Sequence, residues 1–244
     1  MNSTEPDQVS EVPPASLHGA SLILRLVAIG VVIAGIGGLF LYAGGWFTPH
    51  TLSPAVMINR FEQLNGKHSG FRRNHAKGVC VSGYFESNGH GVALSKAVVF
   101  QTGRVPVIGR FALAVGQPDA VDSAHTVRSL ALLFKLPDGE EWRTGMNNIP
   151  VFAVNSAQGF YDLLLAAKLD AATGKPVPEK MSAFLAKHPE SVQAMQLIRS
   201  RPISSGFTDS TYNSLDAFRF INVQGTVRPV RWSMVPVQPF EPIS

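Results

Sequence analysis

The chain has 244 residues, enough for one domain with a sizeable hydrophobic core beside a membrane segment. Only 16% of the residues are charged, 45% are hydrophobic, and the formal net charge is +4. The arginines and lysines are scattered rather than clustered, which argues against a nucleic-acid partner and favours pairing with carboxylates. The single cysteine, Cys80, excludes an internal disulfide and a cysteine zinc site, and its apolar neighbours predict a small buried side chain.

The N-terminal region predicts a transmembrane anchor over residues 22–47, preceded by a disordered tail over residues 1–21. The stretch from Leu26 to Trp46 has no charged side chain, and a helix of about 20 residues spans the roughly 30 Å apolar layer of a bilayer. A cleaved signal peptide and a buried core helix are the alternatives. We expect an uncleaved anchor, with the rest of the chain on the extracytoplasmic (periplasmic) side of the membrane.

The remaining chain, residues 53–244, is predicted to be one α+β domain. A helix is expected over Ala55–Leu64, after the cap-like pair Ser53–Pro54. Short β runs then follow between Gly78 and Val154, and their spacing indicates a barrel or a sandwich. These runs are Val79–Phe85, Val92–Phe100, Val105–Val115, Val127–Leu136, a strand that resumes at Trp142, and Pro150–Val154.

Apolar residues return to helical spacing after Asn155–Ser156. The expected helices are Ala157–Lys168, Glu179–Lys187 and Pro189–Arg199. Two further strands are expected over Ala217–Val223 and Val227–Met234, with a turn at Gln224–Gly225 between them. The segment from Pro236 to Ser244 is rich in proline and predicts no regular element.

A histidine and an asparagine are the strongest candidates for catalysis. His75 lies directly before the first β run, and Asn147 lies far downstream, followed by Asn148 and Pro150. An imidazole can move a proton between the two oxygens of a peroxide, and a carboxamide can hold the peroxide by hydrogen bonds. The pair therefore suits peroxide chemistry on a heme face. Taken singly, a histidine before a strand is usually structural, and an asparagine pair before proline usually forms a turn.

Several motifs occur together in the order and spacing of heme catalases. They are Arg72-x-x-His75-Ala76-Lys77-Gly78, Gly83-Tyr84-Phe85, Arg110-Phe111 and Asn147-Asn148-x-Pro150-x-Phe152. The run from Phe71 to Cys80 resembles the small, membrane-associated catalase-related peroxidases, and the resemblance extends from about Ser53 to Gln238. It implies a catalase-like antiparallel β-barrel with flanking helices and a heme cofactor. The implied activity is the reduction of hydrogen peroxide or organic hydroperoxides by a small organic electron donor, in defence against oxidative stress.

The resemblance also implies roles for the catalytic pair. His75 matches the distal histidine, which takes a proton from the peroxide and returns it to the leaving oxygen. Asn147 matches the distal asparagine, which hydrogen-bonds the peroxide. The other histidines match no motif, and their spacing predicts no site for a free metal ion.

Four further residues match positions that contact heme in the family. Arg72 and Arg110 match arginines that pair with the propionates, for which the guanidinium fork is well suited. Phe152 and Phe160 match aromatic residues that line or stack on the porphyrin. Without the resemblance, the two arginines would be interpreted as solvated and Phe160 as the buried face of its helix.

Near the catalytic pair the sequence departs from the family pattern. Ala112 stands where full catalases commonly carry a serine that hydrogen-bonds the distal histidine. Arg73 and Asn74 replace small apolar residues that usually precede it. Both departures are expected to weaken the release of oxygen from hydrogen peroxide and to favour peroxidase chemistry.

The iron ligand of catalases has no match in this sequence. In the family a tyrosine on a late helix binds the iron, four residues after an arginine. None of the tyrosines follows an arginine at that distance: Tyr42, Tyr84, Tyr161, Tyr212. We expect either a fragment of a longer protein or a shortened product, with a barrel that is incomplete at the C-terminus, weak heme binding and an exposed strand edge.

Two alternatives to peroxidase activity therefore stay open. The chain could be an inactive remnant of a catalase fold, or a protein that binds heme or lipid at the membrane. It could also isomerise fatty-acid hydroperoxides on the same fold.

Overall fold

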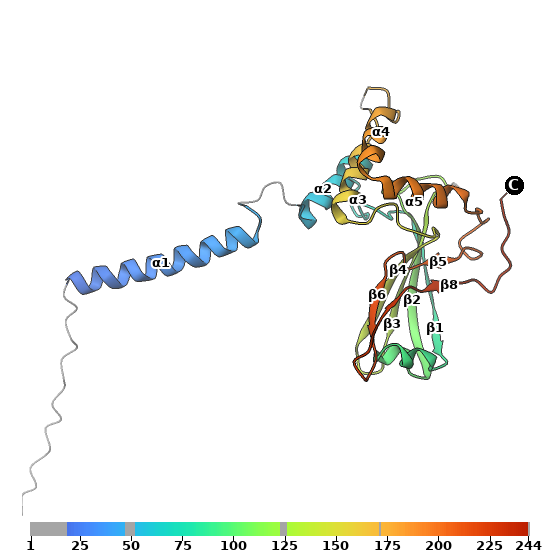
Figure 1. Ribbon diagram of the computed structural model, residues 1–244, viewed down its shortest axis with the longest axis horizontal. Coiled ribbons are helices and arrows are strands. Elements are labelled where there is room, and N and C mark those ends of the chain that lie inside the picture. The colour runs from blue at the N-terminus through green and yellow to red at the C-terminus, as the bar shows by residue number, and fades with distance from the viewer. Residues whose placement is uncertain (1–18, 47–51, 123–125, 171, 244) are drawn as a thin grey trace, which may run out of the picture. The chain divides into compact units, whose positions relative to one another are not determined.

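The computed structural model describes residues 19–46, 52–122, 126–170 and 172–243 (Figure 1). The chain divides into two units, and the boundary between them along the sequence lies between Ser53 and Pro54. In the first unit, helix α1 (Gly19–Ala43) is long and apolar enough to cross a membrane, and none of its residues is buried. An N-terminal signal sequence can also meet this criterion of length and apolar composition. The helix includes the last three residues of the expected tail, whereas residues 1–18 and 47–51 lie outside the described ranges.

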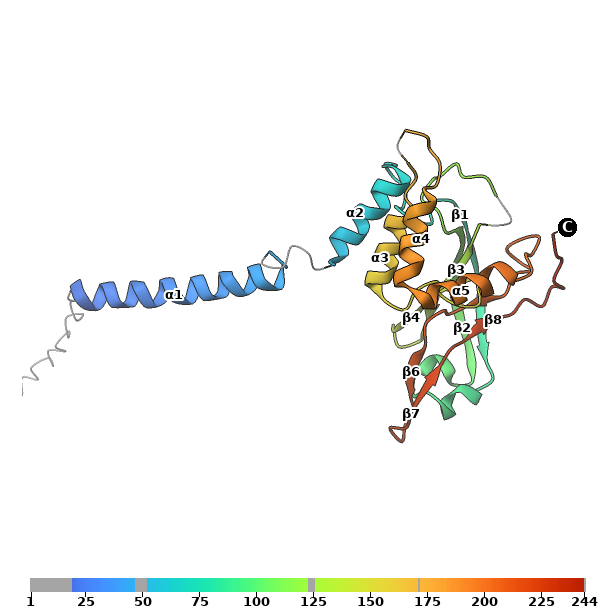
Figure 2. The same ribbon diagram turned by 45° about the horizontal axis from the view of Figure 1, so that its top comes forward.

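The second unit combines antiparallel strands with short helices (Figures 1 and 2). Its helices are α2 (Pro54–Asn65), α3 (Ala157–Ala166), α4 (Pro178–Lys187) and α5 (Pro189–Ser200), with 3-10 helices η1 (His90–Ala93) and η2 (Val98–Phe100). Its long strands are β1 (Gly78–Ser87), β2 (Gly103–Leu113), β3 (Arg128–Lys135) and β4 (Glu141–Asn147). Its short strands are β5 (Tyr212–Asn213), β6 (Phe218–Ile221), β7 (Val227–Val230) and β8 (Ser233–Met234).

The helices begin where the sequence supplies helix-starting residues. Proline opens α2, α4 and α5, and proline is favoured there because a first-turn N–H needs no intrahelical partner. At α3 the hydroxyl of Ser156 accepts a hydrogen bond from the backbone N–H of Gly159 at 3.1 Å, as an N-cap does. Helices α2, α3 and α4 gather at one end of the long strands, and the 3-10 helices (green) lie at the other end (Figures 1 and 2).

Six strands form one curled antiparallel sheet, a half-barrel, in the order β1-β2-β3-β4-β5-β8. Strands β6 and β7 form a separate hairpin, closed by a turn in which Gly225 has φ 79°. Strand β1 is at an edge of the sheet, so one side of its backbone has no strand partner within the described residues.

The two faces of the sheet differ because successive side chains of a strand point to opposite sides. One face, here called the core face, carries Val107, Leu130, Phe134 and Met146, all buried. Aromatic and sulfur side chains cover it: Trp142, Tyr212, Trp232, Met234. The opposite face, here called the open face, carries Ile108, whose side chain is 44% exposed, together with the exposed Ala131.

Most expected elements are confirmed, and the exceptions have physical causes. Val92–Phe100 contains two 3-10 helices rather than a strand, because Gly89 (φ 81°) turns the chain before it. Pro150–Val154 forms bends, and Val227–Met234 splits into β7 and β8. The expectation of a buried Cys80 is wrong: its Cα pairs with Arg110 across β1 and β2, so its side chain lies on the open face and is exposed.

Phe134 is the centre of the core face, with its side chain only 1% exposed. Its ring lies 5.2 Å from that of Phe85 and 4.9 Å from that of Trp142, both in edge-on contacts. We expect Phe134→Ala to lower the free energy of unfolding by about 3–5 kcal/mol, because it leaves a cavity among packed rings. Denaturant unfolding monitored by near-UV circular dichroism measures the loss.

The matched control for Phe134→Ala is Val121→Ala, at a side chain that is 79% exposed. A surface substitution of this kind changes stability by less than about 0.5 kcal/mol. Equal effects of the two substitutions would contradict the assignment of the core face.

Candidate active site

The open face carries a patch of mostly small side chains at the end of the sheet nearest the helices (Figures 1 and 2). Ala112 of β2 pairs with Ser129 of β3, which pairs with Asn147 of β4. In the next row the pairs are Arg110 with Ala131, and Ala131 with Gly145. Because directly opposite residues of antiparallel strands point to the same side, both rows lie on one face.

A cavity of about 350 Å³ lies over these two rows. Three segments outside the strands contribute to its lining: the segment before β1, the segment after β4 and the segment after β5. The lining side chains from these loops are Arg72, His75, Phe152, Ser214, Leu215 and Asp216. Five of the six residues predicted for the site therefore line one cavity: Arg72, His75, Arg110, Asn147 and Phe152.

Phe160, the sixth predicted residue, does not line this cavity. It lies on α3, where its ring centroid is 5.3 Å from that of Phe152 and 6.0 Å from that of Phe61. It belongs to the hydrophobic cluster around Val154 and Phe184. Phe160 thus supports the wall that Phe152 presents to the cavity.

Arg110 fixes the segment that carries His75. Its guanidinium donates hydrogen bonds to the carbonyl oxygens of His75 at 2.9 Å and Ala76 at 3.1 Å. Gly78 leaves room for this contact, since a Cβ there would lie 2.7 Å from Cζ of Arg110. His75 has a φ of 55°, a left-handed conformation that is uncommon for a residue other than glycine, and the two hydrogen bonds help to hold it.

Burial and two neighbouring cations favour a neutral imidazole at His75. Burial lowers the pKa of His75 from its ordinary value, and the positive charges of Arg110 and Arg72 lower it further. A hydrogen bond with the backbone of Leu113 acts in the opposite direction on this pKa. A neutral imidazole at neutral pH has a free ring nitrogen that can accept a proton.

Asn147 is held at the end of β4 by a residue that sequence reasoning missed. The Ser129 hydroxyl donates a hydrogen bond to Oδ1 of Asn147 at 2.6 Å, so the amide NH₂ of Asn147 remains available as a donor. The neighbouring Asn148 is tied to the backbone of Arg128 by two hydrogen bonds of 2.9 Å. The feature that identifies Ser129 as a site residue is its position opposite Asn147, which is known only from the strand register.

The lining of the cavity includes groups that could hold a dianionic cofactor. The guanidinium groups of Arg72 and Arg110 are the donors that match carboxylates such as heme propionates. The floor is formed by small residues, and a Cβ built on Gly145 would meet nothing within 4 Å. Phe152 adds an aromatic wall. Within the described ranges no tyrosine lines the cavity: Tyr212 lies on the core face, and burial raises its pKa to about 12.

The half-barrel and its cavity define a catalase-type fold. A solved bacterial catalase superimposes with a TM-score of 0.62 over 79% of this chain and 38% of its own, at 23% identity. A solved fungal catalase gives the same TM-score at 19% identity, over 79% of this chain and 39% of its own. At these identities the comparison concerns the fold alone.

The catalase sequence family matches residues 43–244, and the chain belongs to this family. It is 36% identical over 210 residues to a catalase-related peroxidase of Synechococcus elongatus, covering 86% of this chain and 61% of the relative. It is 31% identical over 194 residues to a catalase-related peroxidase of Mycolicibacterium paratuberculosis, covering 79% of this chain and 61% of the relative. The chain therefore spans about three fifths of the length of these relatives.

The electrostatic arrangement predicts how the pKa of His75 responds to substitution. We expect Arg110→Gln to raise it toward the ordinary value of about 6.5, because one repelling cation is lost. Arg72→Gln should raise it less, and Arg199→Gln, on the exposed surface of α5, should leave it unchanged. Titration of the His75 ring resonances by NMR, assigned with His75→Gln, measures the shift.

The lowered pKa of His75 also determines how its contribution to the stability of the fold changes with pH. The pKa of His75 is lower in the folded chain than in the unfolded chain, so the unfolded chain binds more protons between the two values. The contribution of His75 to stability is therefore present above about pH 6.5 and is lost as the pH falls toward the folded-state pKa. A lowered pKa of His75 in Arg110→Gln would contradict the electrostatic interpretation.

Proposed function

We propose that this chain is a heme-dependent peroxidase that reduces hydrogen peroxide or organic hydroperoxides with electrons from a small organic donor. The observation that carries the proposal is the convergence of His75 and Asn147 on one cavity with Arg72 and Arg110. Membership of the catalase family and the similarity to two catalase-related peroxidases support it. We place the role in defence against oxidative stress.

In this proposal the residues of the cavity have separate roles in binding and in proton transfer. Arg72 and Arg110 hold the propionates, and Phe152 packs beside the porphyrin. Asn147 donates a hydrogen bond from its amide to the peroxide, and neutral His75 moves the proton of one peroxide oxygen to the other, which leaves as water or alcohol. Heme, when bound, supplies the redox chemistry of O–O cleavage. Overall, a peroxide ROOH and a donor AH₂ give ROH, water and A, so two electrons and two protons pass from the donor.

Ala112 supports peroxidase rather than catalase turnover. It lies beside Ser129 on the floor of the cavity and has no hydroxyl to orient the His75 ring. Arg73 has a smaller influence than its size suggests, because its guanidinium pairs with Glu62 of α2 at 3.1 Å. We therefore expect oxidation of an organic donor to exceed oxygen release.

We further propose that residues 22–47 anchor the chain in a membrane and that residues 53–244 form the peroxidase domain on the extracytoplasmic side. The length and apolar composition of α1 support an anchor, as does the fact that none of its residues is buried. Protease protection of the chain in sealed vesicles, before and after permeabilisation, tests the orientation.

The principal test uses the full chain in lipid nanodiscs, incubated with hemin. We expect a Soret band and oxidation of a phenolic donor by hydrogen peroxide. Replacing the proton-transfer group with His75→Gln should lower the turnover by about 100-fold or more while the Soret band remains. The matched control is His90→Gln, at an exposed histidine of η1 outside the cavity.

Each other outcome of this test selects an alternative. Absence of a Soret band supports an inactive remnant of the fold, and a Soret band without turnover supports a heme-binding protein. Conversion of a fatty-acid hydroperoxide without consumption of the donor supports an isomerase. Vigorous oxygen release from hydrogen peroxide would count against the peroxidase assignment.

Ser129 gives a second prediction that does not depend on turnover alone. We expect Ser129→Ala to free the Asn147 amide and to lower kcat/KM for peroxide by up to about tenfold, as for the loss of one hydrogen bond. Ser129→Thr, which keeps the hydroxyl, should retain activity. The side-chain amide resonances of Asn147 should move in Ser129→Ala and not in Ser82→Ala, an exposed serine of β1. Unmoved resonances would show that Ser129 does not orient the amide.

A further inference from the structure

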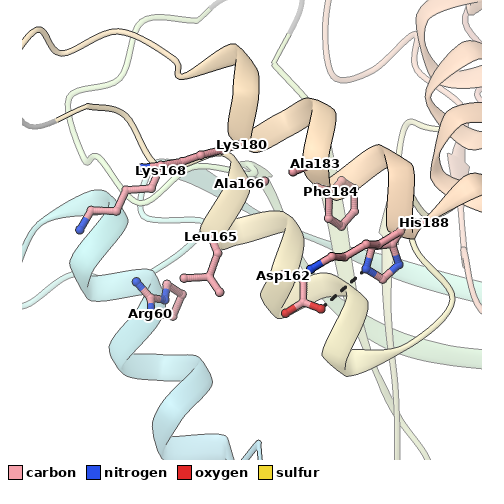
Figure 3. Close-up of a pocket in the computed structure, with 10 residues that line it drawn as sticks. Arg60, Asp162, Leu165, Ala166, Lys168, Lys180, Ala183, Phe184 and His188 are labelled. Carbon is pink, nitrogen blue, oxygen red and sulfur yellow. Dashed lines mark ion pairs between the residues drawn. The ribbon is translucent and has the colours of Figure 1, made fainter.

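A second cavity lies among α2, α3 and α4, with a volume of about 520 Å³ (Figure 3). None of its lining residues lines the candidate active site. We propose that this helical pocket binds an amphipathic carboxylate, that is, an organic acid with an apolar chain. This binding would be separate from peroxide chemistry and would not require heme.

The floor of the helical pocket is apolar and well packed. Ala166 of α3 and Phe184 of α4 are buried, with 7% and 5% of their surface exposed, and they belong to one hydrophobic cluster. Leu165 and Ala183 also line the pocket, and Figure 3 shows Leu165 on the side of α3 toward Arg60 and Ala183 next to Ala166. A floor of this kind favours an alkyl chain over a hydrated ion.

The rim of the helical pocket is strongly positive. Four cations line it: Arg60 from α2, Lys180 and Lys187 from α4, and Lys168 from the segment that follows α3. Of the described residues, Asp162 is the one carboxylate that lines it, and its carboxylate lies 3.7 Å from Nε2 of His188 (Figure 3). The other ring nitrogen of His188 contacts Glu190 at 3.1 Å. The rim thus has more positive than negative charge and attracts an anion.

Arg60 provides a specific donor for that anion. Its guanidinium donates a hydrogen bond to the hydroxyl of Tyr161 at 3.0 Å and lies 5.2 Å from the centre of the Tyr161 ring. Its Nε is buried and has no hydrogen-bond partner among the described residues. A buried donor without a partner is unfavourable, and a shift of the Arg60 side chain toward the pocket would let a carboxylate oxygen satisfy it.

The combination of these features selects the ligand class. A small hydrophilic anion such as phosphate would use the cations but leave the apolar floor uncovered. A neutral lipid would use the floor but leave the cations and Nε of Arg60 unsatisfied. An amphipathic carboxylate uses both, because its head reaches the rim while its chain lies on Leu165, Ala183 and Phe184.

The test is equilibrium dialysis of the full chain in phosphatidylcholine nanodiscs, without heme, against radiolabelled octanoate. Empty nanodiscs measure partitioning into the lipid. We expect saturable binding of octanoate that exceeds the binding of acetate, which lacks the chain, and of octanol, which lacks the charge. Equal binding of acetate or of octanol would overturn the proposal.

Variants then locate the binding. Lys180→Gln combined with Lys187→Gln should weaken octanoate binding by at least about tenfold, the effect of losing one charge-assisted hydrogen bond or more. Arg60→Gln should act in the same direction. The matched control combines Lys96→Gln with Lys135→Gln, two exposed lysines outside the helical pocket.

A third variant keeps the proposal testable if Arg60→Gln fails to fold. Ala183→Phe fills the floor without changing charge and should reduce octanoate binding while the far-UV circular dichroism is retained. The proposal is wrong if all pocket variants bind octanoate like the control. The heme test on the same samples reports independently on the candidate active site.

Discussion

The hydrogen bonds from Arg110 to the carbonyl oxygens of His75 and Ala76 join the loop before β1 to the sheet. They connect His75, a residue in the left-handed conformation, to strand β2, whose position is fixed by ten paired residues with β1 and seven with β3. A guanidinium is suited to this role because its donors are held in one plane and point to two acceptors at once. A hydrogen bond between the His75 ring and the backbone of Leu113 in β2 is a second contact, and it acts on the imidazole itself.

The register of β2, β3 and β4 supplies the other half of the site. The core face is filled with large side chains, whereas the open face has alanine, serine and glycine where the cavity lies. The contrast has a physical origin, because a sheet needs only one packed face for stability. The second face is therefore available to line a cavity, and Ser129 and Asn147 are placed on it side by side.

Sequence reasoning reached the strands β1 to β4 and the helices, because their apolar spacing and their prolines are local signals. Five of the six site residues that it predicted line one cavity, because several motifs agreed in order and spacing. It could not reach Ser129, since the pairing with Asn147 depends on a register between strands separated along the chain. Cys80 shows the same limit: its apolar neighbours indicated burial, but an edge strand with one open face left it exposed.

The electrostatics of the site follow from the same arginine that sets its geometry. Arg110 must lie close to His75 to bind its carbonyl oxygen, and at that distance its charge also lowers the pKa of the ring. For a proton acceptor the two effects are compatible, because a neutral imidazole is the form that takes a proton. Burial acts in the same direction and is the larger cause. Any side chain that replaced Arg110 would therefore have to supply both the two donors and the positive charge. Glutamine has amide donors but no charge, and lysine has the charge but lacks the planar arrangement of donors.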